Sequence, residues 1–157
     1  QVCVSPTRFY VQQGIYDRFA EEFGRRAADW PVGDGLAEGT RMGPLANRRR
    51  PPAIAALVDD AVGQGARLLA GGAAGEEGFF YRPTVLAEVP DSAEIMRTEP
   101  VGPVALMRPF ATEEEAIAQA NRLPFGLAAF AFTENGRRAN RLGDAIEAGM
   151  VGINSFA

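Results

Sequence analysis

The chain has 157 residues, a length typical of one ordinary domain with a single sizeable core. Sixteen basic against twenty acidic side chains leave a net charge of −4, which argues against a nucleic-acid partner because phosphate binding needs a local surplus of Lys and Arg. The basic cluster 48–50 is more typical of a solvated helix start than of a phosphate patch. No run of about eighteen apolar residues occurs, so we expect no membrane-spanning helix. The chain starts with Gln, not Met, and shows no signal-like segment, so we expect a piece of a larger protein.

Two scarce residue types narrow the chemistry. The sequence has no histidine, which excludes His-based triads, His–Cys dyads and His-containing metal sites. Its single cysteine, Cys3, allows neither an internal disulfide nor a multi-cysteine metal site. We therefore expect no metal cofactor. A lone thiol suits a reducing compartment, which predicts a cytoplasmic protein.

The first part of the chain predicts a strand followed at once by a helix. Residues 8–11 are aromatic and β-branched, as strands tend to be. An apolar residue then recurs at every fourth position from Ile15 to Ala27, which predicts a helix over 15–28 with one buried face. The Gly- and Pro-rich stretch 31–44 predicts a long loop, and such loops usually carry a task or cover a surface.

The middle of the chain predicts a second helix and two more strands. Pro51 suits a first helical turn and Gly65 suits the position after the last turn, so a helix is expected between them. Strands are predicted at 67–70, before Gly71 and Gly72, and at 84–89. Asp91 followed by Glu94 is a capping-box pattern that predicts one short helical turn. The expected buried stripe of the second helix is Ile54, Leu57, Val58, Ala61 and Val62.

The last part of the chain continues the alternation. A strand is predicted at 104–110, then a helix from a Thr112–Glu115 capping box to about 122, with Ala116, Ile117 and Ala120 inward. The nearly all-apolar run 127–133 predicts a strand covered on both faces. Asn135 is expected to cap a helix through about 148, followed by a strand over 150–154. This alternation predicts an α/β domain with a mainly parallel sheet, helices on both faces and right-handed crossovers.

Cys3 is the first candidate for chemistry, on a loop that enters a strand. From chemistry alone, a solitary cysteine is more often a small buried hydrophobe. A nucleophile must react as the thiolate, which needs a cation, a base or a helix N-terminus nearby. Within five residues of Cys3 only Arg8 offers such help. Activation of this thiol must therefore come from elsewhere in the fold.

Two further residues are candidates for binding, each with a plain structural alternative. Glu99 stands on a Pro- and Gly-rich loop ahead of a strand, where side chains are presented to ligands, although most loop glutamates are merely solvated. Asn154 ends the last strand, where asparagine is usually a turn or cap residue. No glycine-rich phosphate loop occurs. The acidic runs 76–77 and 113–115 are typical of solvated faces rather than of a catalytic carboxylate pair.

Several short motifs follow one another along the chain in a fixed order. Gln1-Val2-Cys3 resembles a Gly-Gln-x-Cys nucleophile motif whose leading Gly would fall before residue 1, and the run Glu99 to Val104 is similar to a Glu-x-Phe-Gly-Pro-Val loop. Further pieces of the same set are 42–45, 71–72, 82–86, 120–121, 125–129 and 149–154. In this order and approximate spacing the set resembles the NAD(P)-dependent aldehyde dehydrogenase superfamily, and the resemblance covers essentially the whole chain.

The resemblance implies that residues 1–157 are a partial, truncated catalytic domain. Cys3 would attack the aldehyde as a thiolate, its backbone N–H would supply half of an oxyanion hole, and Glu99 would bind the hydroxyls of the ribose beside the nicotinamide. The cofactor, NAD or NADP, would be bound mainly by a domain absent from this chain. The second oxyanion donor, the general base and an oligomerisation segment would also lie outside it. The complete protein that contains this chain is expected to be a homodimer or homotetramer that acts on a small-molecule aldehyde.

Several residues depart from the family pattern. Val101 replaces the aromatic residue that packs near the nicotinamide end, so this cofactor-positioning contact is expected to be lost. Thr98 stands where many members have another Glu, and two prolines open the second helix. Residues 3–23 are similar to members acting on succinate semialdehyde and related aldehyde acids. Some of those carry a second cysteine where this chain has Ser5, which excludes a local disulfide switch here.

Three readings of function follow from these residues. The first is a fragment of an active aldehyde dehydrogenase. The second is a catalytically silent scaffold or assembly domain, which Val101 favours and which predicts that Cys3 is no more reactive than a model thiol. The third is a relative that transfers the acyl group to coenzyme A. The first and third both need Cys3, and the sequence does not discriminate between them.

Overall fold

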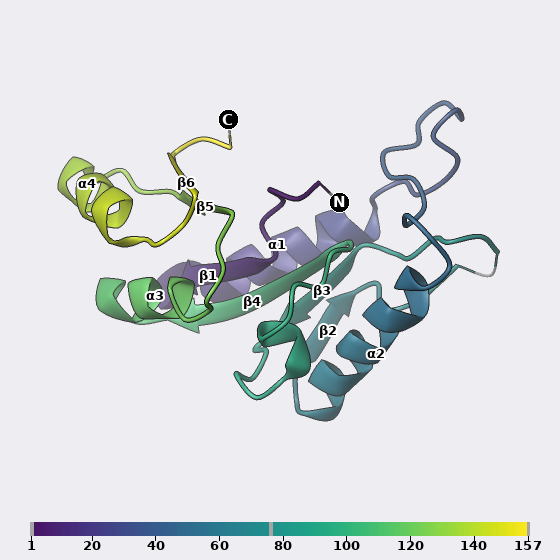
Figure 1. Cartoon of the computed structure of the whole chain (residues 1–157), viewed down its shortest axis with the longest axis horizontal. Coiled ribbons are helices and arrows are strands. Elements are labelled where there is room, and N and C mark those ends of the chain that lie inside the picture. The colour runs from purple at the N-terminus through teal and green to yellow at the C-terminus, as the bar shows by residue number, and fades with distance from the viewer. Residues whose placement is uncertain (1, 76, 157) are drawn as a thin grey trace. The chain divides into compact units, whose positions relative to one another are not determined.

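A computed structural model describes residues 2–75 and 77–156, and it divides into two compact units (Figure 1). One unit is Thr7–Pro109. The other combines Val2–Pro6 with the chain from Phe110 onward. Each unit is described by itself below. In the part of the chain with described structure, no helix is both long and apolar enough to cross a membrane.

The first unit is built on a four-stranded sheet with the order β1-β4-β3-β2. Strands β3 (Thr84–Ala87) and β4 (Val104–Phe110) are parallel, with Thr84 opposite Val104. Strand β2 (Arg67–Ala70) is antiparallel to β3 and has a register shift between Leu68 and Ala70. Strand β1 (Arg8–Gln12) forms the other edge. The predicted α/β class is therefore confirmed, with one antiparallel edge strand added.

Helices cover both faces of this sheet, as predicted (Figure 1). Alternate residues of a strand point to opposite faces, and the two core clusters follow this period. Helix α1 (Tyr16–Ala28) packs with Val85, Ala87, Ala105 and Met107. Helix α2 (Arg50–Gly63) packs with Leu86, Val104 and Leu106 on the other side. Because the same two central strands serve both clusters, β3 is buried at every position.

Three predicted boundaries in this unit need correction. The first helix starts at Tyr16, after a 3₁₀ turn over Gln13–Ile15, so Ile15 is exposed instead of buried. Helix α2 starts one residue before Pro51, and its Val62 is exposed. Strand β3 ends at Ala87 instead of residue 89, because the next residue, Glu88, adopts a left-handed φ of 55° that leaves the extended ladder.

The predicted Asp91–Glu94 capping box is wrong, although a short 3₁₀ turn does form over Glu94–Met96. Asp91 instead pairs with Arg108 on β4. The backbone N–H of Glu94 is bound by Asp60, whose Oδ2 lies 2.8 Å away on α2. The cap therefore comes from a residue 34 positions earlier, which a local motif does not reveal.

The second unit contains α3 (Glu113–Ala120), β5 (Ala128–Ala131), α4 (Gly136–Ala145) and β6 (Met150–Ile153). The two strands pair in parallel, with Ala128 opposite Met150. Both predicted helix caps are confirmed. Thr112 Oγ1 accepts the Glu115 N–H at 3.2 Å, and Asn135 Oδ1 accepts the Arg138 N–H at 3.0 Å.

Some expectations for this unit are wrong. Helix α4 ends three residues before 148, because Ile146 turns to an extended conformation with ψ 121°. Ala120 is exposed instead of inward. Strand β5 is only half-buried, and the following Phe132 is 58% exposed, so the described structure does not cover this apolar run on both faces.

Candidate functional site

Cys3 lies on an exposed turn and its thiol is free. The turn is closed by a hydrogen bond from the Ser5 N–H to the Val2 carbonyl, 3.0 Å long. The segment Val2–Pro6 belongs to the second unit, whereas Glu99 and Val101 belong to the first. In the described structure the side chain of Cys3 is not packed in a core, so its reading as a small buried hydrophobe is wrong there.

Arg8, the cation nearest to Cys3 in sequence, is occupied by backbone carbonyls far along the chain. Its Nη2 donates to the Thr98 carbonyl at 2.7 Å and, with longer bonds of 3.3 and 3.4 Å, to the carbonyls of Met96 and Ile95. These bonds tie the start of β1 to the segment that leads into Glu99. Arg8 thus anchors the backbone immediately before the candidate acid.

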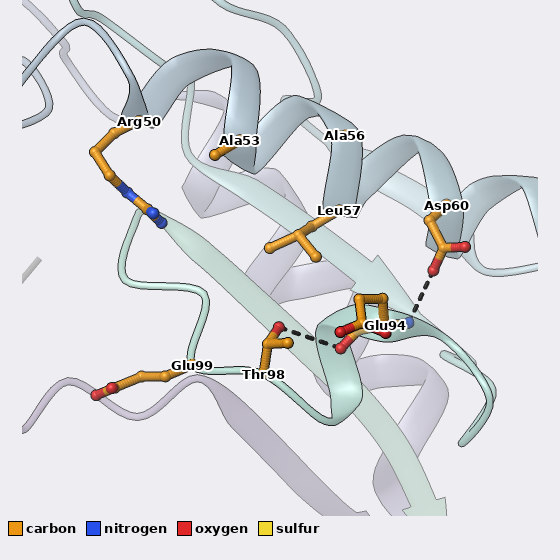
Figure 2. Close-up of a pocket in the computed structure, with 8 residues that line it drawn as sticks. All are labelled: Arg50, Ala53, Ala56, Leu57, Asp60, Glu94, Thr98 and Glu99. Carbon is orange, nitrogen blue, oxygen red and sulfur yellow. Dashed lines mark hydrogen bonds between the residues drawn. The ribbon is translucent and has the colours of Figure 1, made fainter.

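The first unit has a groove between α2 and the segment that follows the Glu94–Met96 turn, with a volume of about 540 Å³ (Figure 2). We call it the α2 groove. One wall is apolar and comes from the helix, whereas the polar groups gather at its two ends (Figure 2). The groove is lined by Arg50, Ala53, Ala56, Leu57, Asp60, Glu94, Thr98 and Glu99.

One end of the α2 groove is held by a small polar network. Asp60 accepts the Glu94 N–H and also the side-chain amide of Gln64, each at 2.8 Å. The bond from Glu94, and then that from Gln64, lowers the pKa of Asp60 below its ordinary value. Thr98 Oγ1 donates to the Glu94 carbonyl at 3.2 Å (Figure 2). Since Asp60 and Thr98 are engaged with backbone, this end has a structural role.

Glu99 lies at the other end of the groove, exposed, with its carboxylate pointing away from Glu94 and Asp60 (Figure 2). No described residue forms an ion pair or a side-chain hydrogen bond with it. A carboxylate in this setting can accept two O–H donors from a ligand, as vicinal hydroxyls would require. Among the described residues, therefore, no side chain donates to Glu99 in competition with a ligand.

Arg50 secures the backbone that follows Glu99. It projects from the first residue of α2 towards this loop (Figure 2). Its Nη2 donates to the carbonyl of Pro100 at 2.7 Å and to that of Val101 at 3.1 Å. The sequence prediction of a solvated helix start holds for Arg48 and Arg49, which are exposed, but is wrong for Arg50, which is half-buried.

Val101 has an uncommon backbone conformation. Its φ of 22° lies in the left-handed region, where a β-branched residue is rare and strained, and its side chain is 51% exposed. The next residue, Gly102, packs so closely on α2 that a Cβ there would lie 2.9 Å from Ile54 Cδ1. The loop is thus pressed against the helix immediately after its strained residue.

Two of the remaining sequence candidates make hydrogen bonds within the second unit, whereas Glu76 of the acidic run 76–77 lies outside the described residues. The Asn154 side chain accepts the Thr133 N–H at 2.8 Å and donates to the Thr133 carbonyl at 2.9 Å, as a turn residue does. Glu113 binds Arg141 through two bonds of 2.7 Å and Arg138 through one of 3.1 Å. Among residues 2–75 and 77–156 no group of three or more His, Cys, Asp or Glu side chains is placed to hold a metal ion.

Comparison with known proteins places the chain in a family. Residues 1–157 match the sequence model of the aldehyde dehydrogenase family. The chain is 42% identical over 156 residues to a succinate-semialdehyde dehydrogenase [NADP(+)] of Escherichia coli K12, covering 99% of this chain and 32% of that protein. It is 41% identical over 155 residues to a glutarate-semialdehyde dehydrogenase of Pseudomonas putida, with the same coverage of each.

Solved structures agree with the sequence comparison. The NAD⁺ complex of an aldehyde dehydrogenase from Bacillus cereus superposes with a TM-score of 0.95 at 31% identity, covering 100% of this chain and 32% of that one. An NADP-dependent enzyme of Escherichia coli gives the same TM-score at 41% identity, with 100% and 33% covered. The chain therefore spans about a third of the length of the proteins it matches. It belongs to the aldehyde dehydrogenase family.

Proposed function

We propose that the complete protein containing this chain oxidises a small aldehyde to a carboxylic acid with NAD or NADP, with Cys3 as the nucleophile. The observation that carries the proposal is the exposed thiol of Cys3, the single cysteine of a chain that belongs to this family. An exposed thiol is accessible to a substrate, as a nucleophile must be. The chain itself is a partial catalytic domain, and the activity belongs to the complete protein.

The chemistry at Cys3 proceeds through two covalent states of the sulfur. The Cys3 thiolate attacks the aldehyde carbon, a C–S bond forms, and the carbonyl oxygen becomes an oxyanion that the Cys3 N–H helps to stabilise. Bound NAD or NADP, beside whose ribose Glu99 would lie, would supply the acceptor for the hydride of this carbon, and Cys3 would then hold the carbon as an acyl thioester. A general base outside this chain then takes a proton from water, which attacks the thioester carbon; the C–S bond breaks, the acid departs, and Cys3 leaves as thiolate.

Glu99 fits a role in binding the ribose next to the nicotinamide. Its carboxylate is exposed at one end of the α2 groove, and no described residue competes for its oxygens. Two carboxylate oxygens match two vicinal hydroxyl donors. Val101 stands where the resembled family motif has an aromatic residue, and we expect it to offer less apolar surface for the cofactor. We assign the other contacts of NAD or NADP to the part of the protein outside this chain.

We expect the substrate of the complete protein to be a semialdehyde, such as succinate semialdehyde. The names of the two relatives above specify succinate and glutarate semialdehydes, which carry a carboxylate at the end opposite the aldehyde. We expect a substrate of the same class here. We also expect the complete protein to be cytoplasmic and to assemble as a homodimer or homotetramer.

The test is cofactor reduction by the complete protein. Absorbance of NADH or NADPH is followed with succinate semialdehyde, glutarate semialdehyde and uncharged aldehydes of matching length. We expect reduction that Cys3→Ala abolishes and that Ser5→Ala, two residues away, leaves unchanged. Acid as the product supports the proposal, whereas an acyl-coenzyme A formed only when coenzyme A is added would assign the protein to the acylating relatives. A folded protein that binds the cofactor but reduces none with any aldehyde would be a silent scaffold.

A further inference from the structure

We propose that Arg50 is a positioning residue for Glu99, because it holds the loop after this acid in a conformation that the loop does not favour by itself. The inference rests on the proposed function, in which Glu99 binds the ribose of the cofactor. It assigns Arg50 no direct contact with the ligand. Its effect on cofactor binding passes through the backbone of Pro100 and Val101.

The contacts of Arg50 are directed at the peptide groups that follow Glu99. A single terminal nitrogen, Nη2, donates to two successive carbonyls, at 2.7 Å to Pro100 and at 3.1 Å to Val101. Bonds from a charged donor are stronger than those between neutral groups. Pro100 is buried, so its carbonyl gains a partner where solvent access is limited. The guanidinium thus fixes the orientation of both peptide planes relative to α2.

The conformation that these bonds fix is a costly one. Val101 has φ 22°, which crowds a β-branched side chain against its own backbone. The Val101 side chain is half exposed, so packing around it does not hold the conformation. Strained residues persist only where their surroundings over-determine them. At Val101 the surroundings that do so are the Arg50 bonds and the close packing of Gly102 on Ile54.

Glu99 therefore lies between two arginine anchors. Arg8 holds the carbonyl of Thr98 on its N-terminal side, and Arg50 holds those of Pro100 and Val101 on its C-terminal side. A carboxylate that must meet two hydroxyls gains affinity when its backbone is fixed beforehand, because less freedom is lost on binding. Loss of the Arg50 anchor would leave Glu99 in place but less ordered.

The experiment uses the complete protein and separates cofactor binding from chemistry. Because one charged hydrogen-bond donor is removed, we expect Arg50→Ala to raise the KM for the cofactor by about tenfold while kcat changes by less than about threefold. Arg50→Lys should recover part of the loss, since one ammonium can still reach one carbonyl. Arg49→Ala is the matched control: this neighbour is exposed and its side chain bonds no described residue, so the KM should stay unchanged.

A double-mutant cycle with Glu99 decides whether Arg50 acts through it. In a Glu99→Gln background, Arg50→Ala should add little to the KM for the cofactor, whereas independent effects would multiply. In a Val101→Gly background, Arg50→Ala should raise the KM for the cofactor by a smaller factor than in the protein that retains Val101, because Gly adopts the left-handed conformation without strain. Amide hydrogen exchange should speed up over 99–102 in Arg50→Ala and not in Arg49→Ala.

The outcomes separate this inference from the proposed function. If Glu99→Gln raises the KM but Arg50→Ala does not, or if the two effects multiply, the positioning role is overturned and the ribose-binding role of Glu99 stands. If Glu99→Gln leaves the KM for the cofactor unchanged, the positioning role of Arg50 and the ribose-binding role of Glu99 are both overturned. Faster exchange across the whole first unit in Arg50→Ala would mean a general stabilising residue and would also overturn the inference.

Discussion

The side-chain hydroxyl of Tyr16 accepts the backbone N–H of Glu88 at 2.9 Å, which joins the start of α1 to the residue where β3 leaves the sheet. The same hydroxyl donates to the Met107 carbonyl on β4 at 3.3 Å. Glu88 has a left-handed φ of 55°, and its carboxylate pairs with Arg67 of β2 at 2.8 Å. One phenol thus ties a helix to the residue that follows β3 and to the middle of the neighbouring strand β4.

Replacement of this phenol tests its contribution. Tyr16→Phe should lower the free energy of unfolding by about 1 kcal/mol, because the Glu88 N–H and the Met107 carbonyl both lose a partner. The measurement is amide hydrogen exchange at Glu88 together with the urea midpoint of the protein. Phe19→Tyr, which adds a hydroxyl on the same helix but removes no bond, controls for the change of ring. Unchanged protection of the Glu88 amide in Tyr16→Phe would refute the role.

The same residue predicts an alkaline limit to stability. Burial raises the pKa of Tyr16 above its ordinary value of 10.0, and the bond from Glu88 offsets this only in part. A raised folded-state pKa means that the contribution to stability is complete below pH 10.0 and is lost as the pH rises through the folded value. Tyr16→Phe should therefore flatten part of the fall in urea midpoint above about pH 10. An equal fall in both proteins would exclude Tyr16 as its source.

The pH at which the second unit unfolds in acid should depend on Glu113. Its side chain is only 17% exposed, and hydrogen bonds from Arg141 and then Arg138 lower its pKa below the ordinary 4.5. The contribution to stability is then present above pH 4.5 and is lost as the pH falls through the lowered value. Glu113→Gln should move acid unfolding of this unit to higher pH. Glu114→Gln, at an exposed neighbour, should leave the acid transition where it is.

Two glycines form a matched pair for a test of the fold. A Cβ on Gly71 would lie 2.2 Å from the Pro83 carbonyl oxygen, and its φ is +75°, so Gly71→Ala should destabilise the protein by more than about 2 kcal/mol. Gly63, the last residue of α2, has open space around it. Gly63→Ala should be neutral or stabilise by up to about 1 kcal/mol. Thermal unfolding measures both, and similar midpoints would contradict the close approach at Gly71.

The reactivity of Cys3 separates an enzyme from a silent scaffold. In the complete protein we expect alkylation of Cys3 by iodoacetamide to be at least about tenfold faster than that of a model thiol, because a nucleophile must be held as thiolate. Saturating aldehyde should slow the reaction. A rate equal to that of the model thiol would favour the scaffold reading.

The chain by itself is expected to be inactive. The parts of its relatives that it does not span make up about two-thirds of their length. We predict that the isolated 157 residues neither bind NAD tightly nor produce NADH in a sustained way, and that they tend to aggregate through exposed apolar side chains such as Phe132 and Phe156. Sustained NADH production by the isolated chain would sink this prediction.

The sequence predicted those features that local patterns encode. The strand over 104–110 and the caps at Thr112 and Asn135 are where periodicity and capping rules place them, because their partners lie within a few residues. The features it missed depend on distant partners. The Glu94 N–H is capped by Asp60, and the carbonyls that accept hydrogen bonds from Arg50 lie 50 and 51 residues further along the chain. Such contacts exist only after α2 has packed on the sheet.

The hydrogen bonds from Arg50 to the Pro100 and Val101 carbonyls also limit how the loop 99–103 can be transferred to another protein. Residues 99–103 look like a self-contained cassette, yet their backbone depends on a side chain at the start of a helix half a hundred positions earlier. A chimaera that received the loop alone would contain Val101 but not the Arg50 guanidinium whose hydrogen bonds hold Val101 in its strained conformation. A graft that carries the first turn of α2 together with the loop should keep the loop backbone in its present conformation.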